Sequence, residues 1–179
     1  IGGILENLHS NYRIGHSSYF IAEACEYSDS FLHFHPQIGI VLNVEAEHLD
    51  YFKTYERMVD SFRKYVAGLK PDGCLILNYD YQSLFPDYHG QMLTVSLQNR
   101  DADLTADHIE PAADHLGSHF DCIYKGQNLG RLTIHVPGSH NIFDCLCAIG
   151  AALWSGIPFE KIRSGLEKYR SPKKRFEYK

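Results

Sequence analysis

The sequence has no long hydrophobic run, no signal-peptide pattern at its start and no dense stripe of basic residues. A membrane-spanning helix needs about 20 consecutive apolar residues, so an integral membrane protein is not expected. The 179 residues carry 17 Lys and Arg against 22 Asp and Glu, a formal net charge of −5. That balance argues against a nucleic-acid-binding protein. The chain opens on Ile1 without an initiator Met, so we expect it to be a piece of a longer protein.

Cysteine is too sparse for a disulfide scaffold. The count of 5 is odd, and no Cys-x-x-Cys pair occurs. Reduced thiols in a cytosolic compartment are therefore expected. A Gly-x-x-x-x-Gly-Lys-[Ser/Thr] P-loop is also absent, and no Gly-Lys dipeptide occurs anywhere. A nucleotide site in this chain would therefore need a phosphate cradle from another segment.

The first hundred residues alternate between short apolar runs and a helical pattern. An amphipathic helix is predicted over 55–69, where apolar residues recur at three- and four-residue spacing. Continuous apolar runs are typical of strands buried on both faces of a parallel sheet. The pattern predicts an α/β fold with a mostly parallel sheet flanked by helices. The runs expected to form its strands are 19–24, 38–44, 74–78 and 91–97.

After residue 100 the pattern changes to strands joined by polar turns, which predicts a small antiparallel β flap on the parallel sheet. Helices are expected from about 139 to 154 and over 159–169. Residues 1–170 are expected to form one domain, and residues 171–179 a linker. The strands predicted for the flap are 104–109, 118–124 and 129–136.

Two of the predicted strands end in polar residues. Ligands of open α/β sheets bind beyond the carboxyl ends of the strands, so these side chains could surround one crevice. Carboxylate oxygens suit Mg²⁺, and a histidine could ligate a metal or hold a substrate carboxylate. The alternative is that these acidic loop residues are simply solvated. The candidates are Glu23 in the segment Glu23-Ala24-Cys25-Glu26, and Glu45, Glu47, His48 and Asp50 after the second strand.

Three further groups of residues each have a functional and a structural interpretation. His140 and Asn141 open a predicted helix, where they could contact an anion or a nucleotide, or only cap the helix. The basic run 173–175 could meet phosphate or be solvated. The close pairs His33/His35 and Cys145/Cys147 could suggest zinc, but neither spacing matches a closed structural site. Packing is the better interpretation of the cysteines, because their helix is apolar.

Four motifs occur in order: Phe20-Ile-Ala-Glu-Ala-Cys-Glu-Tyr27, Asn43-Val-Glu-Ala-Glu-His-Leu-Asp-Tyr-Phe52, Pro137-Gly-Ser-His-Asn141 and Lys174-Arg-Phe-Glu177. Together they resemble the central domain of the Mur ligases over essentially the whole chain. The resemblance implies a P-loop NTPase-like domain that here lacks its P-loop segment. Mur ligases use ATP to convert a carboxylate to an acyl phosphate, which an amino acid attacks to give an amide, ADP and phosphate. The motif wording is closest to members that join L-alanine to UDP-N-acetylmuramate in peptidoglycan precursor synthesis.

The resemblance also implies roles for individual residues. Glu23 and His48 would be catalytic ligands of the Mg²⁺ near the γ-phosphate and the acyl phosphate. A dication there would offset repulsion between the phosphates and the attacking carboxylate. Arg175 would be a catalytic residue near the ATP phosphates, with Lys174 beside it, because a guanidinium fork suits phosphate.

The helix that begins near residue 139 would approach adenine. His140 and Asn141 match the family's pair there, but Asp144 stands where the family usually has Asn. An ionised Asp can accept a hydrogen bond from the adenine amino group but cannot donate one to a ring nitrogen. The adenine contact is therefore expected to differ from that of the family.

The family's ligases have an N-terminal UDP-binding domain and a C-terminal domain, neither of which this chain contains. The chain is thus expected to be the central part of a cytoplasmic bacterial ligase and to be inactive alone. One alternative is a ligase that recycles murein tripeptide, using the same sugar carboxylate. Another is a non-catalytic binding domain derived from the same fold, and a third is a zinc-binding regulator.

Overall fold

The computed structural model describes residues 2–4, 9–112 and 116–170. Its centre is a sheet whose six strands lie side by side in sequence order. The pairs from β1 to β4 are parallel, whereas β4, β5 and β6 pair antiparallel. This confirms the predicted α/β fold with its antiparallel flap. The strands are β1 (Ile38–Val41), β2 (Cys74–Asn78), β3 (Gln91–Val95), β4 (Leu104–Pro111), β5 (Ser118–Tyr124) and β6 (Gln127–Ile134).

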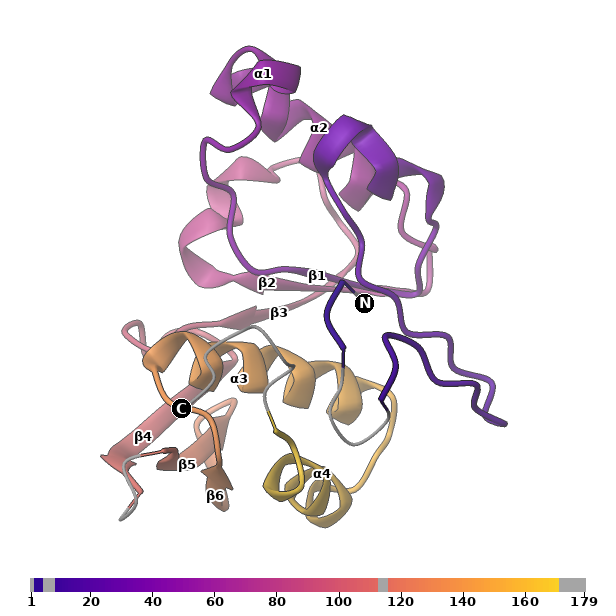
Figure 1. Cartoon of the computed structure of the whole chain (residues 1–179). Helices are drawn as coiled ribbons and strands as arrows, with labels where there is room; N and C mark the ends of the chain where they lie inside the picture. Colours follow the sequence, from indigo (N-terminus) through magenta and orange to yellow (C-terminus); the bar gives the residue numbers. More distant parts are fainter. Residues whose placement is uncertain (1, 5–8, 113–115, 171–179) are drawn as a thin grey trace.

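Helices cover both faces of the parallel part of the sheet (Figure 1). The main helices α2 and α3 lie on opposite sides of β2, and α4 packs beside β6. The segment between β2 and β3 forms a 3-10 helix that begins at Tyr79. The helices are η1 (Tyr27–His33), α1 (Leu49–Phe52), α2 (Tyr55–Ala67), η2 (Tyr79–Leu84), α3 (Ser139–Trp154) and α4 (Phe159–Glu167).

Strand β2 separates two hydrophobic cores. Ile76 belongs to the core beneath α3 and the flap, while Leu75 and Leu77 belong to the core beneath α2. Successive side chains of a strand point to opposite faces, and all three of these residues are fully buried. A strand covered on both faces cannot alternate with polar residues, which explains its continuous apolar run.

Helix α3 runs antiparallel to the parallel strands. The indole Nε1 of Trp154, the last residue of α3, donates to Oε1 of Gln91 at the start of β3, 2.9 Å away. Gly150 lets the helix approach the sheet closely, since a Cβ there would lie 2.9 Å from Cδ1 of Leu104. The first turn of α3 therefore lies at the carboxyl edge of the sheet, where the loops after β1 and β2 also emerge (Figure 1).

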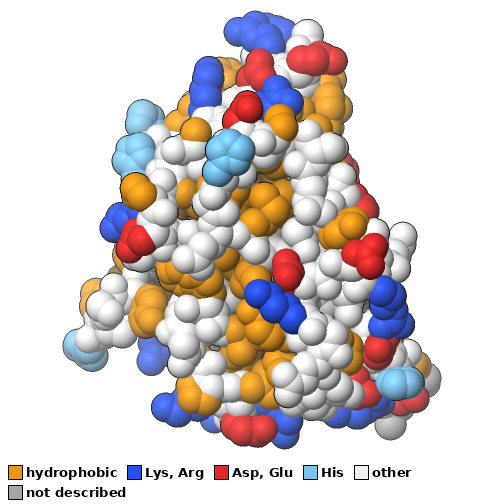
Figure 2. Space-filling view, turned by 180° about the vertical axis from the view of Figure 1, so that it is seen from behind, with side chains coloured by type: hydrophobic (Ala, Val, Ile, Leu, Met, Phe, Trp, Pro, Cys, Tyr) orange, Lys and Arg blue, Asp and Glu red, His pale blue; other side chains and the backbone are white. Residues whose placement is uncertain are grey.

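The predicted strand over 19–24 is wrong. These residues form no strand, and the side chains of Phe20 and Ile21 are 87% and 90% exposed. A strand needs a partner to satisfy its backbone groups, and within the described residues β1 pairs only with β2. Several hydrophobic side chains reach the surface on the face seen in Figure 2. Among the described residues, no helix combines the length and apolar character needed to cross a bilayer.

Candidate metal and nucleotide site

Three potential metal ligands converge from two segments that are distant in sequence. Nε2 of His48 lies 3.2 Å from Oε1 of Glu26. One ligand atom from each of Glu26, Glu47 and His48 lies within 4.8 Å of the other two. Glu26 immediately precedes η1, whereas Glu47 and His48 end the loop that follows β1. Two carboxylates and an imidazole can together hold a divalent cation.

The imidazole of His48 is placed by its backbone and by a neighbouring ring. His48 adopts the left-handed conformation, with φ of 52°, and forms the N-cap of α1. Its ring centroid lies 5.0 Å from that of Tyr27, which is also 6.0 Å from the ring of Tyr51. These contacts limit the directions in which the imidazole can point.

Two hydrogen bonds hold the loop that carries His48. Asn78, the last residue of β2, donates from Nδ2 to the carbonyl oxygen of Leu42 at 3.2 Å. The hydroxyl of Tyr55 donates to the carbonyl oxygen of Val44 at 3.3 Å. The loop after β1 is thus fastened both to the neighbouring strand and to the first turn of α2.

Asp29 links η1 to both helices that follow the loop. Its Oδ2 accepts a hydrogen bond from the hydroxyl of Tyr51 at 2.7 Å, and its Oδ1 accepts from the hydroxyl of Ser61. Ser28 and Asp29 both have left-handed backbones, with φ of 54° and 58°, which costs roughly 1 kcal/mol or more per residue. The hydrogen bond to Asp29 raises the pKa of the Tyr51 phenol.

The other sequence candidates at these strand ends lie elsewhere. The carboxylate of Glu23 accepts a hydrogen bond from the backbone N–H of Gly2 at 2.6 Å, and Glu23 is not a member of the three-residue cluster. Glu45 accepts a weak bond from Nδ2 of Asn43 at 3.4 Å. The structure therefore brings together Glu47 and His48, as expected, and adds Glu26. Glu26 was not among the candidates predicted from the sequence, although it lies in the same polar segment as Glu23.

The His140–Asn141 pair occupies the first turn of α3. Gly138 is the N-cap, and no side chain makes a capping hydrogen bond, so the interpretation of the pair as an ordinary cap is wrong. Instead, Nδ2 of Asn141 donates to the carbonyl oxygen of Pro137 at 2.6 Å and lies 3.1 Å from Nε2 of His140. Gly138 has a φ of +98°, and a Cβ there would lie 2.6 Å from the His140 ring. Glycine therefore makes room for that ring.

Asp144 lies one turn further along α3. The residue is exposed overall, yet partial burial of its carboxyl raises the pKa of Asp144, and His140 opposes this shift. Lys174 and Arg175 lie outside the described residues, as does the whole predicted linker 171–179.

The pairs considered for zinc are not arranged as metal sites. Cys145 and Cys147 are buried in the core beneath α3, and burial raises the pKa of the Cys145 thiol to about 12. Nδ1 of His35 lies 3.2 Å from the carbonyl oxygen of Gly68. The described residues of these pairs join no metal-binding cluster, and packing explains the two cysteines.

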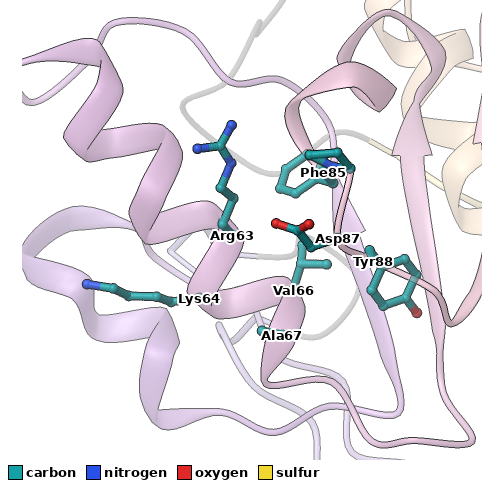
Figure 3. A pocket seen from close by; sticks show the side chains of 8 residues that line it. Arg63, Lys64, Val66, Ala67, Phe85, Asp87 and Tyr88 are labelled. Carbon is teal, nitrogen blue, oxygen red and sulfur yellow. The ribbon is translucent and has the colours of Figure 1, made fainter.

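A separate pocket lies between α2 and the segment after η2 (Figure 3). Its volume is about 270 Å³. Arg63 at its rim already donates to the carbonyl oxygen of Leu84 and to Asp60, and Lys64 points away from the two rings. None of the sequence candidates lines it. The lining residues are Arg63, Lys64, Val66, Ala67, Phe85, Pro86, Asp87 and Tyr88.

Comparison with known proteins supports the same assignment as the motifs. The family model "Mur ligase middle domain" matches residues 5–152. UDP-N-acetylmuramate–L-alanine ligases from Acetivibrio thermocellus and Clostridium perfringens are 38% and 37% identical to the chain, each over 100% of its length. The chain spans 39% of the length of these relatives.

Solved structures share the fold at lower identity. A UDP-N-acetylmuramate:L-alanyl-γ-D-glutamyl-meso-diaminopimelate ligase from Neisseria meningitides matches 97% of this chain and 57% of its own, with a TM-score of 0.79 and 22% identity. A UDP-N-acetylmuramate-alanine ligase from Thermotoga maritima matches 83% of this chain and 32% of its own, with a TM-score of 0.69 and 19% identity. The family model and the full-length similarity to these relatives lead to one conclusion: the chain belongs to the Mur ligase family and corresponds to its middle domain.

Proposed function

We propose that this chain is the ATPase core of an ADP-forming UDP-N-acetylmuramate–L-alanine ligase that acts in the bacterial cytoplasm. The observation that carries the proposal is the convergence of His48 with Glu26 and Glu47 at the carboxyl edge of the sheet. Relatives named for this activity are similar along the whole chain. The shared length is only 39% of theirs, so UDP-binding and C-terminal domains would complete the enzyme.

The proposed chemistry explains why carboxylates and an imidazole meet at this edge. The lactyl carboxylate of UDP-N-acetylmuramate must approach the γ-phosphate of ATP, and both are negatively charged. When bound, Mg²⁺ would supply the charge neutralisation that this approach requires. His48 would hold the cation together with Glu26 and Glu47, whose oxygens lie nearest to it. The family motif implies Glu23 as a further ligand, and its carboxylate would have to leave the backbone N–H of Gly2 to take that role.

The nucleotide would lie between this cluster and the first turn of α3. His140 and Asn141 would approach adenine, and the carboxylate of Asp144 would accept a hydrogen bond from the adenine amino group. Lys174 and Arg175 would contact the ATP phosphates. The chain would then release no ADP alone, because the phosphate cradle and the domain that places the amino acid would come from other segments.

The experiment uses the protein encoded by the complete reading frame, supplied with Mg-ATP and UDP-N-acetylmuramate. ADP release should require L-alanine, and His48→Ala should lower kcat roughly 10²- to 10³-fold, as expected for loss of a group that stabilises transition-state charge. The matched control is His89→Ala, which removes an exposed histidine and should leave kcat unchanged.

The other outcomes assign the alternatives. ADP release that requires the tripeptide L-alanyl-γ-D-glutamyl-meso-diaminopimelate instead of L-alanine would move the chain to the recycling ligases. Absence of ADP release from the folded full-length protein would support a non-catalytic binding domain. An effect of His48→Ala no larger than that of His89→Ala would overturn the role of His48.

A further inference from the structure

We infer that Asp29 is a positioning residue that fixes the separation between Glu26 and His48. The inference rests on the proposed function, in which His48 holds a divalent cation. Asp29 is not a member of the ligand cluster. It acts by tying together the segments that carry the cluster's residues.

The two hydrogen bonds of Asp29 connect these segments directly. Asp29 follows Glu26 by three residues, and Tyr51 follows His48 by three residues. The bond from the Tyr51 hydroxyl to Oδ2 of Asp29, at 2.7 Å, therefore joins the same two segments as the 3.2 Å contact between His48 and Glu26. Loss of the first contact would remove one of the two links that hold these segments together.

His48 moves together with the helical turn that carries Tyr51. The backbone N–H groups of Tyr51 and Phe52 donate to the carbonyl oxygen of His48 at 2.9 and 3.0 Å. Helix α1 has only four residues, and an isolated turn of that length has little stability of its own. The position of His48 therefore depends on the contacts that α1 makes with other elements.

The second hydrogen bond of Asp29, from the hydroxyl of Ser61, connects it to the buried face of α2. Ser61 is 4% exposed and lies in α2 between Met58 and Val66, which are 1% and 2% exposed. The Asp29 carboxylate receives the Ser61 hydroxyl on one oxygen and the Tyr51 hydroxyl on the other. It thus connects the short α1 turn to a helix anchored in the core.

The local backbone supports this role. The left-handed conformations of Ser28 and Asp29 turn the chain immediately after Glu26. Neither η1 nor α1 belongs to the sheet, so the hydrogen bonds between strands do not fix their relative position. In the described structure, the alignment of Glu26 with His48 relies on Asp29 together with the packing of the Tyr27 ring.

The test measures Mn²⁺ binding by electron paramagnetic resonance in the full-length protein without nucleotide. Asp29→Ala should weaken His48-dependent Mn²⁺ binding roughly tenfold, the low end of the range for residues that orient metal ligands. Tyr51→Phe should weaken it by a similar factor. Because both changes remove the same link, the double variant should bind no more weakly than Asp29→Ala alone.

Two control variants separate positioning from stability and charge. Ile162→Val removes a buried methylene group from α4, which lies on the opposite side of the sheet from the Asp29 contacts. It should lower Tm without changing Mn²⁺ affinity. Asp60→Asn removes an exposed carboxylate of α2 that pairs with Arg63 and should also leave affinity unchanged. In the ligase assay, Asp29→Ala should raise the Mg²⁺ concentration needed for half-maximal rate and leave KM for L-alanine unchanged.

The possible failures are distinguishable. Mn²⁺ binding that His48→Ala weakens but Asp29→Ala leaves intact would overturn the positioning role alone. Additive losses in the Asp29→Ala/Tyr51→Phe double variant would also overturn it, because the two residues would then act separately. If wild-type Mn²⁺ binding does not depend on His48, both the proposed metal site and the positioning role of Asp29 are wrong.

Discussion

The reactivity of the cysteine thiols tests whether the two hydrophobic cores on either side of the sheet are closed to solvent. Cys25 is exposed, whereas Cys74, Cys122, Cys145 and Cys147 are all buried. At pH 8 we expect a disulfide reagent such as DTNB to modify one thiol quickly in the native 179-residue chain. In guanidinium chloride it should modify all 5 cysteines.

The expected protection follows from burial and its effect on ionisation. Desolvation raises the pKa of Cys74 to about 11 and that of Cys122 to about 12. At pH 8 the thiolate fractions are then roughly 10⁻³ and 10⁻⁴, against about a quarter for an ordinary thiol with a pKa of ~8.5. Because the thiolate is the nucleophile, these cysteines should react at least about a hundredfold more slowly, even before steric exclusion is counted.

The assay follows the colour change over time and assigns modified sites by peptide mass spectrometry. Cys25→Ser should abolish the fast phase and leave the total under denaturing conditions lower by one. A second fast thiol in the native chain, assigned to Cys145 or Cys147, would refute the placement of α3 against the sheet. It would also reopen the interpretation of those residues as metal ligands.

Two further predictions concern stability. The hydrogen bond from His108 lowers the pKa of Asp121 below its usual 3.8, so this carboxylate stabilises the fold above that pH and loses its effect as the pH falls through the lowered value. Thermal melts should therefore show Asp121→Asn less stable than wild type at pH 6, with the difference disappearing well below pH 3.8; a constant difference would contradict this. Leu146→Ala should lower the free energy of unfolding by about 3 kcal/mol in urea titrations, because Leu146 is 0% exposed and large-to-small core changes typically cost 2–5 kcal/mol. A loss below roughly 1 kcal/mol would mean that α3 does not pack on the sheet.

The sequence predicted the elements whose pattern is set by local burial. The strand over 74–78 and the helix over 139–154 have the bounds expected for them. The strand is a short continuous apolar run covered on both faces, and the helix carries apolar residues along the face that it buries against the sheet. The run 19–24 shows where this reasoning fails. It is apolar enough for a strand, but a strand also requires a partner, and local sequence carries no information on whether one is present.

The sequence by itself determined the family, because four ordered motifs carry it, and it singled out His48 as the histidine of the site. Only the tertiary structure decided which carboxylate meets that histidine. Glu26, not Glu23, lies against His48, since the left-handed turn at Ser28 and Asp29 sets the path of the chain after Glu26. Such a contact joins residues 22 positions apart through hydrogen bonds that depend on three separate elements. The residue pattern within one segment carries no information on how three separate elements pack together, so it cannot predict this contact.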